Sequence, residues 1–260
     1  MISVGIDVGS ISAKAVLLAD GELKGSRLIL TGYNAGRAGE RVFNVLLEAL
    51  GIAAERVDAI VATGYGRNSV TFAHKAVTEI TCHAAGAHFQ DPAVRCVIDI
   101  GGQDSKAIAL DGEGRVRDFA MNDKCAAGTG RFLEVMARAL EVDLDAFGEI
   151  SLKADQPASI SSLCTVFAES EVISLIAKGV SRENIIAGIH ASIGARVIAM
   201  ARRVGLIQPL MMTGGVAKNI GVVKALEQKA GLPVRVSAYA QVNGAIGAAL
   251  IGAGQIEKTS

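Results

Sequence analysis

Apolar positions along the chain follow two periods, one typical of strands and one typical of helices. Short apolar runs predict strands at residues 2–7, 15–18, 57–62, 96–100, 107–110, 210–213 and 234–236. Apolar residues at helical spacing predict helices at 38–50, 132–140, 172–180, 185–200 and 222–227. Strands that alternate with helices favour an α/β fold. The Ala/Gly-rich segment 244–254 is too short to cross a membrane and predicts a packed helix.

The start and the middle of the chain share one pattern, a strand that reaches an aspartate and then a glycine turn. Asp7 lies in GIDVGS, and Asp99, 92 residues later, lies in VIDIGGQD. A hairpin is predicted after each, with turns at Asp20-Gly21 and Asp111-Gly112. We interpret this as an internal duplication that gives two similar lobes with a cleft between them. The first lobe is predicted to hold residues 1–95 plus a C-terminal helix at about 240–260, and the second lobe residues 96–239.

The composition narrows the possible functions. Half of the 260 residues are apolar, and 26 basic residues balance 26 acidic ones, so no charge argument exists for binding nucleic acid or an anionic membrane. The N-terminus MISVGIDVGS has no basic region or cleavage pattern, and no apolar run reaches the roughly 18 residues of a membrane helix. We therefore expect a cytoplasmic protein. In that compartment four cysteines indicate metal binding, catalysis or burial, and not a disulfide framework.

Three glycine turns, each after an apolar strand, suggest a phosphate site. They lie at residues 7–10, 99–104 and 213–219. Glycine lets the backbone approach phosphate oxygens, so that successive amides point at the anion. Ser10, Ser12 and Lys14 add donors, and Asp7 and Asp99 suit a hydrated Mg²⁺. The alternative is three ordinary strand-to-turn junctions. The chain has neither a Walker A sequence nor a G-x-G-x-x-G that opens a helix, which disfavours P-loop and Rossmann folds.

Two of the four cysteines precede predicted helices. Cys125 lies in NDKCAAGTGRF and Cys164 in SSLCTVFAES. The dipole and the unpaired amides of a helix N-terminus stabilise a thiolate, and also the negative charge of a thiolate-bound iron–sulfur cluster. Gly128 and Gly130 would let backbone amides approach sulfur. The alternative is that both cysteines are buried small side chains.

The other two cysteines look unsuitable as ligands. Cys96 begins the apolar strand CVIDI, and Cys82 and His83 in EITCHAAG look like packed side chains. An iron–sulfur cluster needs about four cysteines. Two candidates per chain would supply four in a two-fold dimer, because an isologous interface repeats each patch. One cluster on the dimer axis is therefore expected.

The three glycine motifs together resemble the two-lobed ATPase superfamily of actin, hexokinase, acetate kinase and the 70-kDa heat-shock chaperones, whose lobes are duplicated ribonuclease-H-like units. By this resemblance GIDVGSISAK is the first phosphate loop, IDIGGQDSK the second and MTGGVAKN the adenosine motif. The catalytic residues it implies are Asp7, Asp99, Gln103 and Asp104. The nucleotide-binding residues it implies are Gly9, Ser10, Ile11, Ser12, Ala13, Lys14, Gly101, Gly102, Gly214, Gly215, Lys218, Asn219 and Gln241.

Longer motifs resemble a narrower family. GIDVGS, ATGYGRNS, VIDIGGQD, MNDKCAAGTGRF, CTVFAESEVIS and MTGGVAKN look like the activators of 2-hydroxyacyl-CoA dehydratases, above all component A of 2-hydroxyglutaryl-CoA dehydratase. The likeness covers nearly the whole chain. It implies that Cys125 and Cys164 ligate a [4Fe–4S] cluster shared by two identical subunits. It also implies Mg·ATP, ATP hydrolysis, and ferredoxin or flavodoxin as the electron donor. The dehydratase would receive one low-potential electron.

Other functions stay open at this stage. The wider family includes the ATPase subunits of benzoyl-CoA reductase. A small-molecule kinase of the same fold would need a base, for which Asp104 is conceivable, but no segment looks like a sugar-binding insertion. A non-catalytic actin-like assembly protein would have no use for thiolates at helix starts. The iron content of anaerobically prepared protein would separate the electron-transfer function from the last two.

Overall fold

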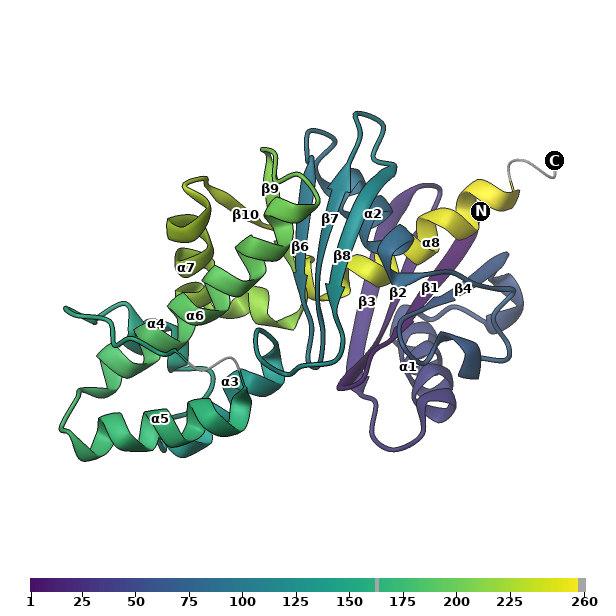
Figure 1. Cartoon of the computed structure of the whole chain (residues 1–260). Coiled ribbons are helices and arrows are strands. Elements are labelled where there is room, and N and C mark those ends of the chain that lie inside the picture. The colour runs from purple at the N-terminus through teal and green to yellow at the C-terminus, as the bar shows by residue number, and fades with distance from the viewer. Residues whose placement is uncertain (162–163, 257–260) are drawn as a thin grey trace. The chain divides into compact units, whose positions relative to one another are not determined.

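The computed structural model describes residues 1–161 and 164–256, which form two compact units. The first unit holds Met1–Val94, Leu110–Arg117 and the chain from Tyr239 onward. The second unit holds Arg95–Ala109 and Asp118–Ala238. Each unit is built on a five-stranded sheet with helices, which confirms the predicted α/β class (Figure 1).

The sheet of the first unit has the strand order β3-β2-β1-β4-β5. The strands are β1 Ile2–Val8, β2 Ser12–Ala19, β3 Glu22–Leu30, β4 Ala59–Thr63 and β5 Lys75–Ala76. β1, β2 and β3 are antiparallel neighbours, whereas β4 runs parallel to β1 and to β5. Asp20 and Gly21 both have positive φ, 52° and 79°, which closes the tight β2–β3 hairpin predicted from the sequence.

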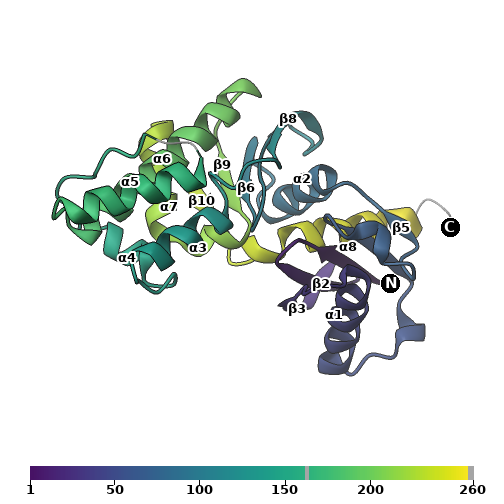
Figure 2. The same ribbon diagram turned by 60° about the horizontal axis from the view of Figure 1, so that its bottom comes forward.

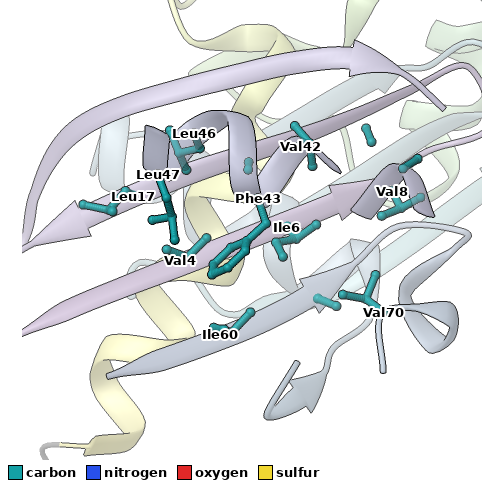
Figure 3. Close-up of a cluster of buried hydrophobic side chains, with 14 residues drawn as sticks. Val4, Ile6, Val8, Leu17, Val42, Phe43, Leu46, Leu47, Ile60 and Val70 are labelled. Atoms are coloured by element: carbon teal, nitrogen blue, oxygen red, sulfur yellow. The ribbon is translucent and has the colours of Figure 1, made fainter. Parts of the chain in front are cut away.

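Helices cover both faces of this sheet. α1 (Ala35–Leu50) places an apolar stripe on one face (Figure 3). α8 (Asn243–Ile256) packs on the other face, and α2 (Glu79–Gln90) packs against α8. The α1 cluster is Val4, Ile6, Val8, Ala13, Ala15, Leu17, Ala38, Val42, Phe43, Leu46, Leu47, Ile60, Ala62 and Val70.

The sheet of the second unit has the order β10-β9-β6-β7-β8. The strands are β6 Cys96–Ile100, β7 Ser105–Leu110, β8 Val116–Asn122, β9 Leu210–Thr213 and β10 Val234–Val236. β6 is antiparallel to β7 and parallel to β9. This repeats the relation of β1 to β2 and β4, and so the structure carries the duplication that the two strand-Asp-Gly motifs predicted.

The helices of the second unit are α3 Gly130–Ala139, α4 Phe147–Ser151, α5 Thr165–Ala177, α6 Arg182–Arg203 and α7 Ile220–Ala230. α3 packs against α5, and α6 packs against α4 and α7 (Figures 1 and 2). α6 is long and apolar enough to cross a membrane by length and composition alone, but 61% of that window is buried within the fold. That burial is typical of a core helix. Short 3₁₀ turns complete the chain at Ala54–Arg56, Arg67–Ser69, Gly215–Lys218 and Ala240–Val242.

Five elements had no range predicted from the sequence, namely β3, β5, β8, α2 and α4, although each predicted hairpin turn implied a strand after it. β3 and β8 each end a sheet, and both carry several exposed residues, so their apolar alternation is weak. α2 is short and rich in small residues, which leaves it without a clear helical stripe. In each case the packing partners, which the sequence pattern does not reveal, determine the structure.

The close approach of α8 to β1 and α2 yields the first prediction. A Cβ on Gly5 would collide with the carbonyl oxygen of Ala245 and the amide of Ala249, and one on Gly247 would collide with the carbonyl of Cys82. Gly5→Ala should therefore destabilise the protein by about 1–3 kcal/mol, the usual cost of overpacking. Urea denaturation measures the difference.

Gly254→Ala is the matched control, because this glycine also lies in α8 but has no atom within 4 Å of its Cβ position. It should change stability by no more than about 1 kcal/mol, in the stabilising direction. Equal stability of Gly5→Ala and the parent would contradict the close packing of β1 on α8.

Candidate functional site

Asp7 lies at the end of β1, beside one residue on each neighbouring strand. Lys14 on β2 and Thr63 on β4 are its register partners. The side chain of Asp7 is buried, with 6% of the residue exposed, and Lys14 Nζ lies 3.3 Å from Asp7 Oδ2. The cation partly offsets the cost of burying the carboxylate.

The second unit repeats this arrangement at Asp99. Its register partners are Lys106 on β7 and Thr213 on β9. Lys106 Nζ lies 3.5 Å from Asp99 Oδ2 and 2.6 Å from Asp104 Oδ2, and Thr213 Oγ1 donates to Asp99 Oδ1 at 2.8 Å. Asp99 is 3% exposed and Lys106 1% exposed. A buried carboxylate, a cation and a hydroxyl therefore meet on three adjacent strands.

A glycine with left-handed backbone follows the threonine in both units. Gly64 has φ 91° and Gly214 has φ 88°. A Cβ on Gly64 would lie 2.6 Å from Asp7 Oδ1, and one on Gly214 would lie 3.0 Å from Asp99 Oδ1. Each carboxylate thus lies against backbone with no side chain between them, and a carboxylate is a preferred ligand of hydrated Mg²⁺.

The glycine turns that follow Asp7 and Asp99 are closed by their own backbone. Gly9 N donates to Ser12 O at 3.0 Å, and Gly101 N donates to Asp104 O at 2.9 Å. Ser10, Ile11, Ser12 and Gly102 are half-buried, and Gln103 is exposed. The Ala13 side chain belongs to the α1 core, so only its backbone can face a ligand.

The predicted adenosine motif forms a third turn. Gly215 and Lys218 are exposed, while Gly214 is buried. Asn219, however, uses its side chain within the fold, because Oδ1 accepts from Val222 N at 3.1 Å and so caps α7. Gln241 is half-buried in the short turn Ala240–Val242, which belongs to the first unit and not to the unit that holds this motif.

His190 and Ser151 hold Asn219 in place. His190 Nδ1 lies 3.0 Å from Ser151 Oγ, which donates to Gly148 O at 2.6 Å, and Asn219 Nδ2 lies 3.3 Å from His190 Nε2. With its proton on Nδ1, the imidazole donates to Ser151 and accepts from Asn219. Burial lowers the pKa of His190 to about 3, so this network requires a neutral imidazole.

A second polar network joins α2 and α8 near Asp7. Gln90 Nε2 donates to Asn243 Oδ1 at 2.7 Å, and Asn243 Nδ2 lies 3.2 Å from His83 Nδ1. The ring therefore presents Nε2 on its other side. A Cβ on Gly244 would lie 3.0 Å from His83 Nε2 and 3.3 Å from Asp7 Oδ2, so both groups face the same glycine. His83 is buried, as expected, but its place beside Asp7 was not foreseen.

Several residues of the site escaped the sequence reasoning. Lys106 could have been found, because it follows Asp99 by the same seven positions that separate Lys14 from Asp7. Thr63 and Thr213 each precede a glycine after a short strand, which is a weaker signal. His83 and Asn243 are 160 residues apart, and no sequence pattern connects them.

Burial divides the four cysteines as predicted. Cys82 and Cys96 are fully buried, and burial raises their thiol pKa values to about 12 and about 11, which disfavours the thiolate needed for metal ligation. Cys125 is half-buried and Cys164 is exposed. The described residues contain no group of three or more potential metal ligands. Two accessible thiols in one chain fit a [4Fe–4S] cluster only if a second chain supplies two more.

The two accessible cysteines differ in their local structure. Cys164 is the N-cap residue of α5, as predicted. Cys125 is not at a helix start, because α3 begins at Gly130 with Thr129 as its N-cap. Its loop is instead held by Asn122, whose Nδ2 donates to Cys125 O at 2.8 Å and to Ala127 O at 3.2 Å. The helix-dipole argument therefore applies directly only to Cys164.

Comparisons with known proteins show the family to which the chain belongs. The model of the BadF/BadG/BcrA/BcrD ATPase family matches residues 4–252. The chain is 51% identical to the activator of lactoyl-CoA dehydratase from Anaerotignum propionicum. The alignment spans 252 residues and covers 96% of each chain.

Solved structures resemble it over the same length. The crystal structure of component A of (R)-2-hydroxyglutaryl-CoA dehydratase from Acidaminococcus fermentans is 47% identical, with a TM-score of 0.95 over 99% of both chains. The activator of 2-hydroxyisocaproyl-CoA dehydratase from Clostridium difficile, solved with bound ADPNP, is 43% identical, with a TM-score of 0.94 over 100% of this chain and 97% of that one. A hexokinase from Thermus thermophilus, 14% identical with a TM-score of 0.55 over 99% of this chain and 100% of that one, supports the predicted actin/hexokinase-like fold.

The buried imidazole of His190 predicts a pH dependence of stability. Its pKa is about 3 in the folded protein against an ordinary 6.5, so below pH 6.5 the unfolded chain takes up a proton that the folded chain excludes. Above about pH 6.5, His190 therefore leaves the free energy of unfolding unchanged. Below that pH, the free energy of unfolding falls by about 1.4 kcal/mol per pH unit, down to about pH 3. Urea denaturation at pH 7 and pH 5 measures it.

His190→Gln keeps an uncharged polar side chain at this position at both pH values. Its loss of stability between pH 7 and pH 5 should be smaller than that of the parent by about 2 kcal/mol. Identical losses in the parent and the variant would show that His190 is not the titrating group.

Proposed function

The chain belongs to the BadF/BadG/BcrA/BcrD ATPase family, and we propose that it is an ATP-dependent activator of a 2-hydroxyacyl-CoA dehydratase. The observation that carries this proposal is the combination of two features in one chain. Each unit places a buried Asp, a Lys and a glycine turn on adjacent strands, and the second unit also carries two accessible thiols.

Nucleotide binding is supported by the repeated strand-end geometry. Asp7 and Asp99 would hold Mg²⁺ through water, and the amides of the glycine turns after them would contact phosphate oxygens. The lysine beside each carboxylate limits the negative charge that would otherwise repel the phosphates. The exposed Gly215 and Lys218 would contact the adenosine part, whereas Asn219 would position that turn through its cap on α7.

A shared cluster in a homodimer is supported by the surface of α5. Cys125 and Cys164 would supply two of four thiolates, and a second copy of the chain the other two. Val166 and Phe167, which follow Cys164, are 66% and 68% exposed, and Ile173 and Ile176 farther along α5 are also exposed. Large apolar side chains next to an accessible thiol suit an isologous interface.

When bound, the [4Fe–4S] cluster would supply one-electron transfer to the dehydratase. We further propose ferredoxin or flavodoxin as the donor and the cytoplasm as the compartment. The chain is 46–51% identical to activators of three different dehydratases, so the proposal names the class of 2-hydroxyacyl-CoA substrates and not one member.

Two alternatives have less support. The chain is 36% identical to a subunit of benzoyl-CoA reductase from Thauera aromatica, below its identity to the dehydratase activators. A small-molecule kinase would need Asp104 as a base, but the Asp104 carboxylate is already engaged by Lys106 in an ion pair of 2.6 Å.

If Cys125 and Cys164 are the cluster ligands, replacing either one should remove iron without affecting nucleotide binding. Cys125→Ala and Cys164→Ala should each remove most of the iron and visible absorbance of protein reconstituted anaerobically, because each substitution removes two of the four ligands of a shared cluster, one from each chain. Nucleotide affinity should stay at the parental value in both variants. Iron analysis measures the cluster content, and nucleotide titration measures the affinity.

Cys96→Ala is the control, since this buried thiol should not ligate and its loss leaves only a small cavity. It should keep one cluster per two chains. A stoichiometry of one cluster per chain, or full iron content in both Cys125→Ala and Cys164→Ala, would sink the shared-cluster proposal.

The strand-end carboxylates predict the effect on ATP hydrolysis. Asp7→Asn and Asp99→Asn should each reduce the hydrolysis rate by about 100-fold or more, the scale expected when a preorganised charged group is lost. Release of inorganic phosphate measures the rate. Asp145→Asn, at an exposed loop position, should hydrolyse ATP like the parent. Unchanged rates in both strand-end variants would place the nucleotide elsewhere.

A further inference from the structure

The second glycine turn is bonded directly to the first turn of α3. Gly130 N donates to Gly101 O at 2.9 Å, and Arg131 N donates to Gly102 O at 2.8 Å. Both donors belong to the first turn of the helix, whose amides have no partner within the helix. All four residues lie in the second unit, so the link does not depend on how the two units are arranged.

No side chain separates the turn from the helix. A Cβ on Gly130 would lie 3.2 Å from Gly101 O and 3.4 Å from the Cα of Gly102. Side chains can absorb a displacement by changing rotamer, but backbone held to backbone by two hydrogen bonds cannot. A shift of the glycine turn must therefore move the start of α3 or break these bonds.

The same end of α3 holds the loop that carries Cys125. Thr129, the fully buried N-cap, donates to Ala126 O through its Oγ1 at 2.6 Å and through its amide at 3.0 Å. Ala126 follows Cys125 directly, and Asn122 Nδ2 holds Cys125 O from the other side. A continuous series of short bonds thus runs from Gly101 and Gly102 to Cys125.

We propose that this series of bonds, the 101–131 strut, carries the nucleotide state of the second glycine turn to the Cys125 thiol. The inference rests on the proposed function, which places phosphate at the turn and a cluster ligand at Cys125. Binding at the turn would shift the start of α3, and that shift would change how tightly the Cys125 loop is held. Coupling between two sites requires such a shared element.

The first unit contains no equivalent connection among its described backbone bonds. There, Gly9 bonds to Ser12, and Ile11 accepts from Thr31, so the turn is tied to its own hairpin and to the end of β3. The strut is therefore a feature of the second copy of the duplicated pattern.

Arg131→Pro removes one bond of the strut and leaves the helix intact. Proline has no N–H, and it is tolerated in the first turn of a helix, where that N–H has no helical partner. A following proline disfavours the helical region for the residue before it partly through that residue's Cβ, and Gly130 has none. Arg131→Ala is the matched control, because it removes the same side chain and its exposed ion pair with Glu134 but keeps the amide.

The experiment uses the anaerobically reconstituted full chain. Iron content and ADPNP affinity are measured first, and then the rate at which a chelator removes iron, with and without Mg·ADPNP. In the parent and Arg131→Ala, nucleotide should change this rate by at least about fivefold, the lower range of typical coupling between sites. In Arg131→Pro, which should still bind iron and nucleotide, the change should fall below about twofold.

A second readout does not need the cluster. In iron-free protein with Cys164→Ser, iodoacetamide should alkylate Cys125 at a nucleotide-dependent rate, because Cys82 and Cys96 are buried. Arg131→Pro should abolish that dependence and Arg131→Ala should keep it. If Arg131→Pro fails to retain iron, the alkylation rate still tests whether the strut couples the glycine turn to Cys125.

The outcomes separate the strut from the function on which it rests. If the parent binds nucleotide and iron, but Arg131→Pro responds to nucleotide as Arg131→Ala does in both assays, the strut is wrong. The same holds if nucleotide binds and changes neither rate in the parent. A parent that binds no nucleotide contradicts the proposed function itself, and the strut with it.

Discussion

A buried carboxylate beside a lysine on the neighbouring strand is the constraint on which both units depend. Asp99 and Lys106 are almost fully buried, and removing one partner of such a pair typically costs about 3–5 kcal/mol. A slip of one residue between β6 and β7 would turn one of the two side chains to the opposite face of the sheet. The pair therefore fixes the register of the hairpin, and with it the position of the glycine turn that joins the two strands. Asp7 and Lys14 impose the same condition on β1 and β2.

The two copies have diverged around this shared element. Lys106 faces two carboxylates and is buried, whereas Lys14 faces one and is half-buried. Thr213 Oγ1 donates to Asp99, whereas the buried Thr63 Oγ1 meets only the thiol of Cys82 among the described residues. A thiol is a weaker hydrogen-bond partner than a carboxylate. The second copy is thus the more fully satisfied one, as suits a turn that must also support α3.

The sequence was sufficient for the features that local patterns encode. A strand, an aspartate and a glycine turn predicted the surroundings of Asp7 and Asp99, and Asp20-Gly21 predicted its hairpin because both residues accept positive φ. The sequence was not sufficient for features that depend on packing between segments far apart in the chain. The exposed edge strand β3 lacks clear alternation, and the bond between Gly130 and Gly101 joins two glycines with no side chain to leave a signal. Cys125 shows an intermediate case, since its loop and the following helix were found, but the cysteine lies five residues before the helix begins at Gly130 and not at the helix start.

Burial places four chemically identical side chains in two different environments. Cys82 in the first unit and Cys96 in the second unit lie in apolar interiors that favour the neutral thiol. The two accessible cysteines, Cys125 and Cys164, both belong to the second unit. The glycine turn after Asp99 lies in that same unit, and its carbonyls accept from the start of α3. A signal that begins at this turn can therefore reach Cys125 without crossing between the units. Under the proposed function, the response of the thiol to nucleotide would then follow from hydrogen bonds inside one sheet-and-helix unit, whatever the other unit does.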